Sequence, residues 1–225
     1  MGFTPVPADP HADAPVLLAG TPLTEARAAL IMVHGRGASA EDILDLSNHL
    51  PADGMAFVAP QAADSTWYPY RFMEPIERNE PWLSSALALL GRLVAQVEAA
   101  GIPAERIGLL GFSQGACLAS EFAVRNPRRW GGVFALSGGL IGPPGTTWPD
   151  RGSLAGTPVF LGCSDVDSHI PASRVEESAD RMRELGADVT MRLYPGMGHT
   201  INRDELAHVQ RGVEAMIASA PNPAR

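Results

Sequence analysis

The amino-acid sequence predicts an α/β fold, in which helices cover both faces of a mostly parallel central sheet. Short runs that are apolar at nearly every position alternate with longer segments in which apolar residues recur every three or four positions. A strand that is apolar on both faces is typical of a parallel sheet buried between helices. The chain length of 225 residues fits one domain with a substantial core. We therefore expect a single domain over residues 1–225, with residues 1–14 as a loosely ordered N-terminal arm.

The predicted strands and helices follow one another in a regular order. Apolar runs bounded by turn residues predict strands at 28–33, 55–59, 106–111, 132–137, 158–163 and 189–194. Helical periodicity predicts helices at 41–50, 82–100, 114–125, 171–185 and 204–219. Ligands of such sheets bind beyond the carboxyl ends of the strands, so the residues that follow each strand are the candidates for chemistry.

The composition excludes several classes of function. The net charge is −8 without a cluster of basic residues, so we expect no nucleic-acid partner. All 17 basic residues are arginines, which excludes a lysine Schiff base and a Walker-type phosphate loop. The two cysteines, Cys117 and Cys163, are too few for a disulfide framework and are expected to be reduced thiols. No apolar run reaches membrane-spanning length and no secretory signal is visible, so we expect a cytoplasmic protein without an integral membrane segment.

The segment from Gly111 to Gly115 reads Gly-Phe-Ser-Gln-Gly and fits the pattern Gly-x-Ser-x-Gly. It follows a predicted strand and opens a predicted helix, which is the context of a nucleophile elbow. In such an elbow the serine occupies a strained turn, and side chains at the glycine positions would collide with the neighbouring strand and helix. A glycine-rich turn with an incidental serine is the alternative. The position between strand and helix favours Ser113 as a nucleophile.

A serine nucleophile needs a base and an acid, which are expected in the order serine, acid, histidine. His199 lies in a loop after the last predicted strand and is the expected base, whereas His208 lies within the last helix. The acid is expected after the preceding strand, where Asp167 is preferred and Asp165 is the alternative. The acid would orient the imidazole and stabilise its charged form. A metal site at this acidic loop is disfavoured because the loop lacks the length and glutamate of a calcium loop.

The tetrahedral intermediate of such a reaction needs an oxyanion hole. One donor is expected to be the backbone N–H of Gln114, directly after the serine. The other is expected from the loop at 34–39, where the backbone N–H of Arg36 is the candidate. The Arg36 guanidinium could alternatively bind an anionic group of the substrate or lie in solvent. His34 is given no acid–base role and is expected only to brace this loop.

The segment 66–82 concentrates aromatic residues in a chain that is only 6% aromatic. A loop of this length is usually either functional or disordered, and its aromatic residues argue against disorder. We predict that it forms a wall of an acyl or aryl pocket, with Trp67, Tyr68, Phe72 and Trp82 as substrate-binding residues. A flap packed on the core is the alternative, above all for Trp82. The stretch 138–148 is expected to form the opposite rim.

These motifs together resemble the phospholipase/carboxylesterase family of α/β-hydrolases, which includes the acyl-protein thioesterases. The resemblance covers most of the chain, from about Ala28 to the last helix, through residues 34–39, 111–116, 165–171 and 196–199. It implies an α/β-hydrolase fold and serine-dependent hydrolysis of esters or thioesters without a cofactor. It also favours Asp167 over Asp165, because the family's acid lies shortly before an Ile-Pro pair. No separate cap domain fits the sequence.

The resulting hypothesis is a serine carboxylesterase that acts on small to medium acyl or aryl esters through an acyl-enzyme intermediate. Its triad would be Ser113, Asp167 and His199, and its only expected partner is a small-molecule ester, apart from a possible homodimer. A lysophospholipase or acyl-protein thioesterase is the alternative within the same chemistry. An acyltransferase is a further alternative. A non-catalytic ligand-binding protein on the same fold is disfavoured, because a receptor need not retain the whole set of residues.

Overall fold

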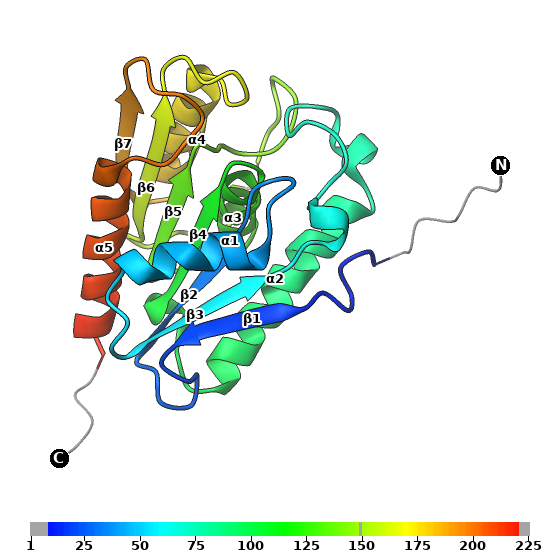
Figure 1. The fold of residues 1–225 in the computed structure, drawn as a ribbon. Helices are drawn as coiled ribbons and strands as arrows, with labels where there is room; N and C mark the ends of the chain where they lie inside the picture. The colour runs from blue at the N-terminus through cyan, green and yellow to red at the C-terminus, as the bar shows by residue number, and fades with distance from the viewer. Residues whose placement is uncertain (1–8, 149, 221–225) are drawn as a thin grey trace.

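The computed structural model of the chain describes residues 9–148 and 150–220 (Figure 1). A seven-stranded sheet in the order β1-β3-β2-β4-β5-β6-β7 forms its centre. Every neighbouring pair is parallel except β1 and β3, which are antiparallel. The strands are β1 (Val16–Gly20), β2 (Ala28–Val33), β3 (Met55–Pro60), β4 (Ile107–Phe112), β5 (Gly132–Leu136), β6 (Pro158–Ser164) and β7 (Asp188–Tyr194). The prediction of a mostly parallel α/β sheet is confirmed.

Helices cover both faces of this sheet, as the sequence predicts. They are α1 (Ala40–Leu44), α2 (Trp82–Ala99), α3 (Gln114–Arg125), α4 (Ala172–Glu184) and α5 (Arg203–Ala218). Buried residues of α2, α3 and α4 share one apolar cluster with the sheet, and those of α1 and α5 belong to a second cluster. In the described residues no helix is both long and apolar enough to cross a membrane.

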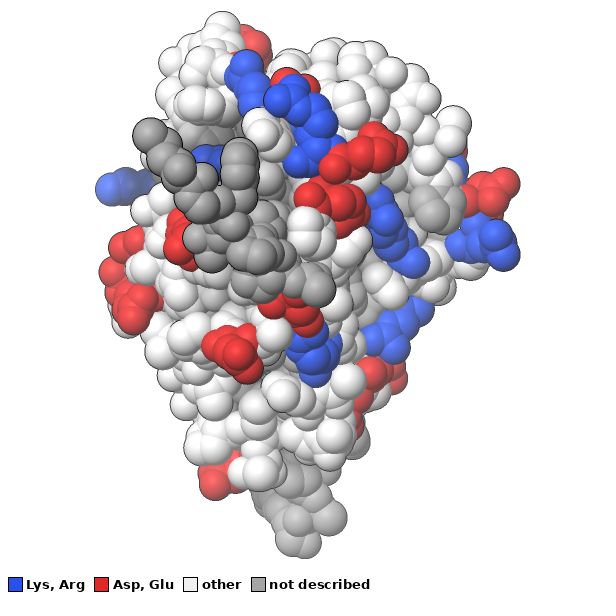
Figure 2. All heavy atoms as spheres, turned by 90° about the vertical axis from the view of Figure 1, so that its right-hand side faces the viewer, with Lys and Arg blue, Asp and Glu red and all other residues white. Residues whose placement is uncertain are grey.

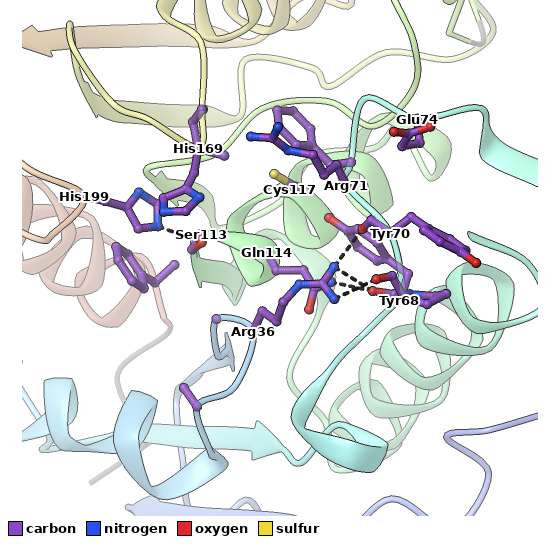
Figure 3. Close-up of a pocket in the computed structure, with 16 residues that line it drawn as sticks. Arg36, Tyr68, Tyr70, Arg71, Glu74, Ser113, Gln114, Cys117, His169 and His199 are labelled. Carbon is purple, nitrogen blue, oxygen red and sulfur yellow. Dashed lines mark hydrogen bonds between the residues drawn. The ribbon is translucent and has the colours of Figure 1, made fainter. Parts of the chain in front are cut away.

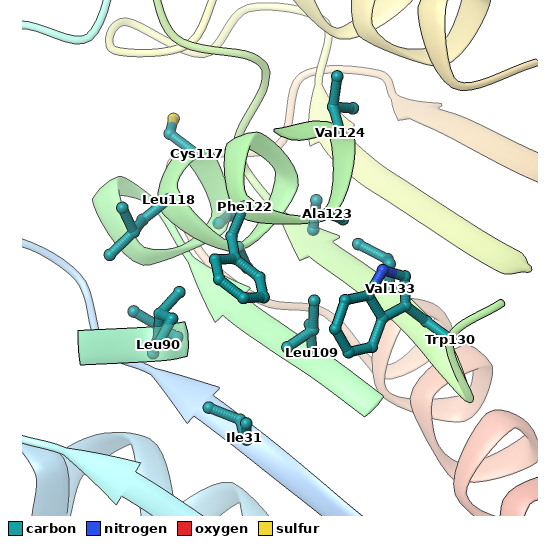
Figure 4. Close-up of a cluster of buried hydrophobic side chains, with 14 of the residues drawn as sticks. Ile31, Leu90, Leu109, Cys117, Leu118, Phe122, Ala123, Val124, Trp130 and Val133 are labelled. Atoms are coloured by element: carbon teal, nitrogen blue, oxygen red, sulfur yellow. The ribbon is translucent and has the colours of Figure 1, made fainter. Parts of the chain in front are cut away.

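The larger cluster holds α3 rigidly against the middle of the sheet (Figure 4). Phe122 of α3 packs between Leu90 of α2 and Leu109 of β4, and all three side chains are almost completely buried. The ring of Trp130, which precedes β5, lies 5.8 Å from that of Phe122. Burial of side chains of this size stabilises a fold by about 1.5–3 kcal/mol each. The start of α3, where the candidate nucleophile lies, is therefore fixed by the core.

Two elements differ from the sequence prediction. The edge strand β1 was not predicted, because its residues are only partly buried and Leu18 is exposed. The helix expected at 41–50 consists of a short α1 followed by a 3₁₀ turn at Asp45–His49. Ser and Asn side chains, which occupy positions 47 and 48, compete for backbone hydrogen bonds and disfavour a continuous helix.

The expected N-terminal arm is only partly within the described residues, since 1–8 lie outside them. Residues 9–14 are not loosely ordered. His11 is completely buried, and both of its ring nitrogens are hydrogen-bonded: Nε2–H donates to the carbonyl of Trp67, and Nδ1 accepts from the backbone N–H of Ala63. Its own backbone N–H donates to Ser85 of α2 at 2.8 Å. This part of the predicted arm is therefore an anchored piece of the fold.

Acidic and basic side chains are interspersed on the face shown in Figure 2, which is the right-hand side of Figure 1. Several arginines of the chain are paired with carboxylates. Arg78 contacts Glu74 at 2.8 Å, and Arg128 contacts Glu98 at 2.9 Å. Exposed pairs of this kind contribute little to stability.

Candidate active site

Ser113 lies on a strained turn between β4 and α3. Its backbone angles are φ 55° and ψ −119°, a left-handed combination that side chains rarely adopt. The turn is held by a hydrogen bond from the Ser113 N–H to the carbonyl of Leu136 in β5, at 2.9 Å. Strain of this kind persists only where the surroundings impose it. The local geometry is that of the elbow that the Gly-x-Ser-x-Gly pattern predicts.

The two glycines of the pattern are required by close backbone contacts. A Cβ atom added at Gly111 would lie 2.3 Å from the main chain of Gly115, and one added at Gly115 would lie 2.0 Å from the carbonyl oxygen of Val33. Both distances are far below van der Waals contact. Any larger residue at either position would push β4, α3 and β2 apart.

The structure brings three predicted residues into one chain of hydrogen bonds. The Ser113 hydroxyl lies 2.8 Å from His199 Nε2, and His199 Nδ1 lies 2.6 Å from Asp167 Oδ2 (Figure 3). In the tautomer that satisfies both contacts, Nδ1–H donates to the carboxylate and Nε2 accepts from the hydroxyl. Such an imidazole can take the serine proton, and the carboxylate can stabilise the resulting charge.

The carboxylate of Asp167 is buried and fully engaged. Its Oδ1 accepts hydrogen bonds from the backbone N–H groups of His169 and Ile170, at 2.8 and 3.0 Å. Burial acts to raise its pKa, but the hydrogen bonds from His199 and from these two N–H groups outweigh burial and place the pKa below the usual 3.8. Asp167 is therefore a carboxylate at neutral pH.

The alternative acid, Asp165, does not contact the imidazole in this way. Its Oδ1 accepts a hydrogen bond from the backbone N–H of Gly196 at 2.8 Å. Gly196 begins the loop that carries His199, so Asp165 orders the loop that positions the histidine. The geometry thus gives the two aspartates different tasks.

Aromatic rings on two sides fix the orientation of His199. The ring of Phe112, the residue before the serine, lies 5.0 Å from the imidazole, and the ring of His169 lies 4.8 Å from it. The His199 side chain remains 20% exposed, which leaves its edge open to the cavity. These contacts restrict the imidazole to the position in which it reaches the serine.

The predicted oxyanion donors lie beside Ser113. A Cβ atom added at Gly35, the neighbour of Arg36, would lie 3.4 Å from the Ser113 Cβ atom, so the loop passes directly next to the serine. Among the described residues, no hydrogen bond uses the backbone N–H of Arg36 or of Gln114. Both N–H groups are therefore available to a ligand at the start of α3, where the helix dipole also favours negative charge.

His34 braces the loop, as expected. Its Nδ1–H donates to the carbonyl of Gly35 at 2.7 Å, and its Nε2 accepts from the backbone N–H of Ala62 at 3.0 Å. Burial lowers its pKa, with the Gly35 carbonyl acting in the opposite direction, so the ring is neutral and both nitrogens are occupied. No nitrogen of this ring is left for proton transfer.

The side chain of Arg36 holds the neighbouring segment. Its guanidinium donates to the carbonyls of Tyr68, Pro69 and Tyr70 at 2.8, 2.9 and 2.7 Å. The Gln114 side chain donates to the same carbonyl of Tyr68 at 2.8 Å (Figure 3). The alternative in which the Arg36 guanidinium binds an anionic substrate is therefore disfavoured, because three of its donors hold it against the backbone of this segment.

A cavity of about 530 Å³ opens over Ser113, which is within the size range of small-molecule sites. Tyr68 and Phe72 line it, as predicted. Residues without a predicted role in the pocket also line it, and some of these follow from their spacing, since Cys117 comes one helical turn after the serine. These further residues are Gly35, Ala38, Pro69, Tyr70, Arg71, Glu74, Phe112, Cys117, His169 and Ile170.

Trp67 and Trp82 do not line this cavity. Trp67 is completely buried, and its indole N–H donates to the carbonyl of His34 at 2.8 Å. Trp82 packs against the core at the start of α2, with its ring edge-on to that of His11. Both side chains pack into the fold, so the structure does not place them in the cavity wall where the sequence prediction expected them. The stretch 138–148 contributes no lining residue either.

Comparison with known proteins places the chain in a family. The model of the phospholipase/carboxylesterase family matches residues 20–217. The crystal structure of a phospholipase/carboxylesterase from Dyadobacter fermentans is 45% identical, with a TM-score of 0.86, over 90% of this chain and 97% of that one. Acyl-protein thioesterase 1 of Eremothecium gossypii is 29% identical over 95% of this chain and 99% of its own length. Acyl-protein thioesterase 2 of Zea mays, at 18% identity over 90% of this chain and 99% of its own, has the same fold with a TM-score of 0.67. The chain therefore belongs to the phospholipase/carboxylesterase family and is a hydrolase with the α/β-hydrolase fold.

Proposed function

We propose that the protein hydrolyses small to medium acyl or aryl esters through an acyl-enzyme intermediate on Ser113. The observation that carries this proposal is the continuous chain of hydrogen bonds from Ser113 through His199 to Asp167, which starts at the floor of the cavity. A serine hydroxyl, a base and an oriented carboxylate in that order are what nucleophilic acyl transfer requires.

In the acylation step, the Ser113 oxygen attacks the ester carbonyl while His199 Nε2 takes the hydroxyl proton. The Asp167 carboxylate stabilises the imidazolium, and the backbone N–H groups of Arg36 and Gln114 donate to the oxyanion of the tetrahedral intermediate. The imidazolium then returns its proton to the departing alkoxide, and the acyl group remains on the serine. In the second step His199 activates a water molecule, which releases the carboxylic acid and restores the hydroxyl.

A second candidate is the hydrolysis of long-chain thioesters on proteins. It is favoured by one comparison, since the Eremothecium gossypii relative that matches nearly the whole chain is named an acyl-protein thioesterase. The same triad would carry out this reaction, so acyl-chain length separates the two candidates. A cytoplasmic location and a homodimer stay predictions from the sequence.

The experiment is hydrolysis of p-nitrophenyl esters from acetate to palmitate by the wild type and by Ser113→Ala. We expect activity that is highest at short chains and a loss in kcat of about 10⁴–10⁶-fold in the variant. A maximum at palmitate would favour the thioesterase candidate. If an added alcohol outcompetes water for the acyl group, the protein is an acyltransferase. Equal rates for wild type and variant across the series would rule out the Ser113 mechanism.

A further inference from the structure

Arg71 has a position in the cavity that the proposed mechanism does not use. It lines the cavity together with Arg36 and Glu74, which are the other fully charged residues there. In Figure 3 its side chain extends from the segment before α2 across the cavity, toward the side where His169 and Ser113 lie. A cationic group therefore faces the reacting centre from the opposite wall.

The other charged groups of the cavity are already engaged. The Arg36 guanidinium donates to the three consecutive carbonyls at 68–70, and Glu74 contacts Arg78 at 2.8 Å. The side chain of Arg71, by contrast, has no hydrogen bond, ion pair or aromatic partner among the described residues, and the residue is exposed. Among these three charged side chains, only the guanidinium of Arg71 has all of its donors free of the described residues.

The backbone around Arg71 is fixed, which distinguishes it from an arginine on a loose surface loop. The buried side chain of Asn79 accepts from the Tyr70 N–H at 2.9 Å and donates to the Arg71 carbonyl at 3.2 Å. The carbonyl of Phe72 accepts from the backbone N–H of Gly142 at 2.8 Å. The guanidinium therefore extends from a point that is held on both sides.

The charge of this wall also contrasts with that of the whole chain. The protein carries a formal net charge of −8, yet its cavity is lined by two arginines and one carboxylate. The N-terminus of α3 adds further positive potential beside Ser113. A negatively charged ligand is repelled by the protein as a whole but is attracted at this site.

On these grounds we propose that Arg71 is a specificity residue that binds a carboxylate or phosphate on the substrate, at the end remote from the scissile ester. The guanidinium fork matches either oxyanion with two parallel hydrogen bonds. The substrate class is then an ester with an anionic end, such as the half-ester of a dicarboxylic acid. This inference rests on the proposed ester hydrolysis at Ser113.

The experiment compares half-esters with neutral esters of the same chain length. Mono-p-nitrophenyl glutarate, adipate and suberate are paired with p-nitrophenyl valerate, hexanoate and octanoate. Butyrate esters of 4-hydroxybenzoate and 4-hydroxybenzamide place the charge in the other half of the molecule, and butyrate esters of 4-hydroxyphenyl phosphate and phenol test a phosphate there. The enzymes are the wild type, Arg71→Gln, Arg71→Lys and Arg183→Gln. Arg183 is an exposed arginine of α4, paired with Asp180 and absent from the cavity lining, so its variant controls for net charge.

We expect kcat/KM of the wild type to favour the anionic member of at least one pair. For Arg71→Gln, kcat/KM should fall by about tenfold to a hundredfold with the anionic ester of that pair and stay unchanged with its neutral partner. Arg71→Lys should recover part of the loss, and Arg183→Gln should match the wild type. The inference is overturned if the wild type shows no preference for the anionic ester in any pair. It is also overturned if Arg71→Gln lowers kcat/KM equally for both esters of a pair. It is also overturned if Arg183→Gln shows the same loss. Each of these outcomes requires turnover of neutral esters, whereas failure of the proposed function would abolish turnover of every ester.

Discussion

The side chains of Arg36 and Gln114 meet on one acceptor, the carbonyl oxygen of Tyr68, each at 2.8 Å. These are the two residues whose backbone N–H groups are proposed to form the oxyanion hole. Because both side chains donate to the same carbonyl of the cavity wall, the proposed oxyanion hole and this wall form one hydrogen-bonded unit. The spacing of the two N–H groups therefore depends on side chains that do not react.

Replacement of Arg36 by methionine is expected to lower kcat by about tenfold to a hundredfold, because the backbone at position 36 loses three anchoring hydrogen bonds and its N–H is no longer aligned. Arg36→Lys should retain part of the rate, since one amine can reach one carbonyl. Steady-state kinetics with p-nitrophenyl butyrate provide the measurement. Arg211→Met, at an arginine of α5 remote from the site, serves as the control. A fall in melting temperature with kcat unchanged would show that the three bonds serve stability alone.

At position 113, glycine is expected to give a more stable protein than alanine, although neither variant can form an acyl-enzyme. The left-handed backbone of Ser113 is strained for any residue with a Cβ atom, and glycine relieves this strain by about 1 kcal/mol. Urea unfolding of Ser113→Gly and Ser113→Ala measures the difference. At Ser120, inside α3, the order should reverse, because glycine weakens a helix. The same order at both positions would contradict strain at the elbow.

The two aspartates after β6 are expected to respond differently to the same substitution. Asp167→Asn should lower kcat by about 10³–10⁴-fold, because an amide no longer stabilises the imidazolium or fixes its tautomer. Asp165→Asn keeps an oxygen that can accept from the Gly196 N–H, so its kcat should fall by less than about tenfold. Both variants are assayed with the same ester at saturating concentration. Equal losses would assign the acid role to the loop as a whole rather than to Asp167.

Glu205 is expected to make the stability of the protein depend on pH. It is buried in the first turn of α5, where its Oε2 accepts from the Asn202 N–H at 2.8 Å, while its Oε1 has no partner among the described residues. Burial, assisted by the charge of Asp204, raises its pKa from 4.5 to about 7, although the Asn202 hydrogen bond acts against this. A raised pKa means that the protonated form stabilises the fold. This stabilisation is complete below pH 4.5 and is lost as the pH rises to about 7.

The free energy of unfolding should therefore contain a term that falls by roughly 3 kcal/mol between pH 4.5 and pH 8. Glu205→Gln cannot ionise and keeps an acceptor oxygen, so this decline should largely disappear and the variant should be the more stable protein at pH 8. Urea unfolding at intervals of one pH unit makes the comparison. Glu214→Gln, at an exposed glutamate of the same helix, controls for net charge. An unchanged pH slope in Glu205→Gln would mean that Glu205 ionises in the fold as it does in water.

The sequence predicts most of the fold, because strands in the middle of a parallel sheet have a strong signature. The run at 28–33 is buried at every position, and the structure places β2 over the same residues. The edge strand β1 has no such signature, since it is covered on one side only and its pairing with β3 is set by distant residues. Local composition cannot reveal a strand whose stability comes from its neighbour.

The same distinction applies to the site. The elbow at Ser113 could be predicted because its two glycines are required by close backbone contacts within the motif and with β2. Any turn of this kind makes such contacts. The cavity wall could be predicted only as a segment. Tyr68 and Phe72 line the cavity, while Trp67 and Trp82 pack on the core. The aromatic composition of the segment does not reveal toward which side each ring points. Arg71 carries no motif, so its place in the cavity emerges only from the path of the folded segment.

The Arg36 guanidinium donates to backbone carbonyls, which every residue possesses, and not to side chains of the segment that it holds. The exposed residue at position 70 can therefore change without loss of the attachment, whereas Tyr68 is buried in the core. A new side chain at position 70 would reshape the cavity while the reacting groups keep their places. Substrate range can thus evolve separately from the catalytic residues, and libraries built at the exposed positions 70 and 71 would change the substrate range without disturbing the triad.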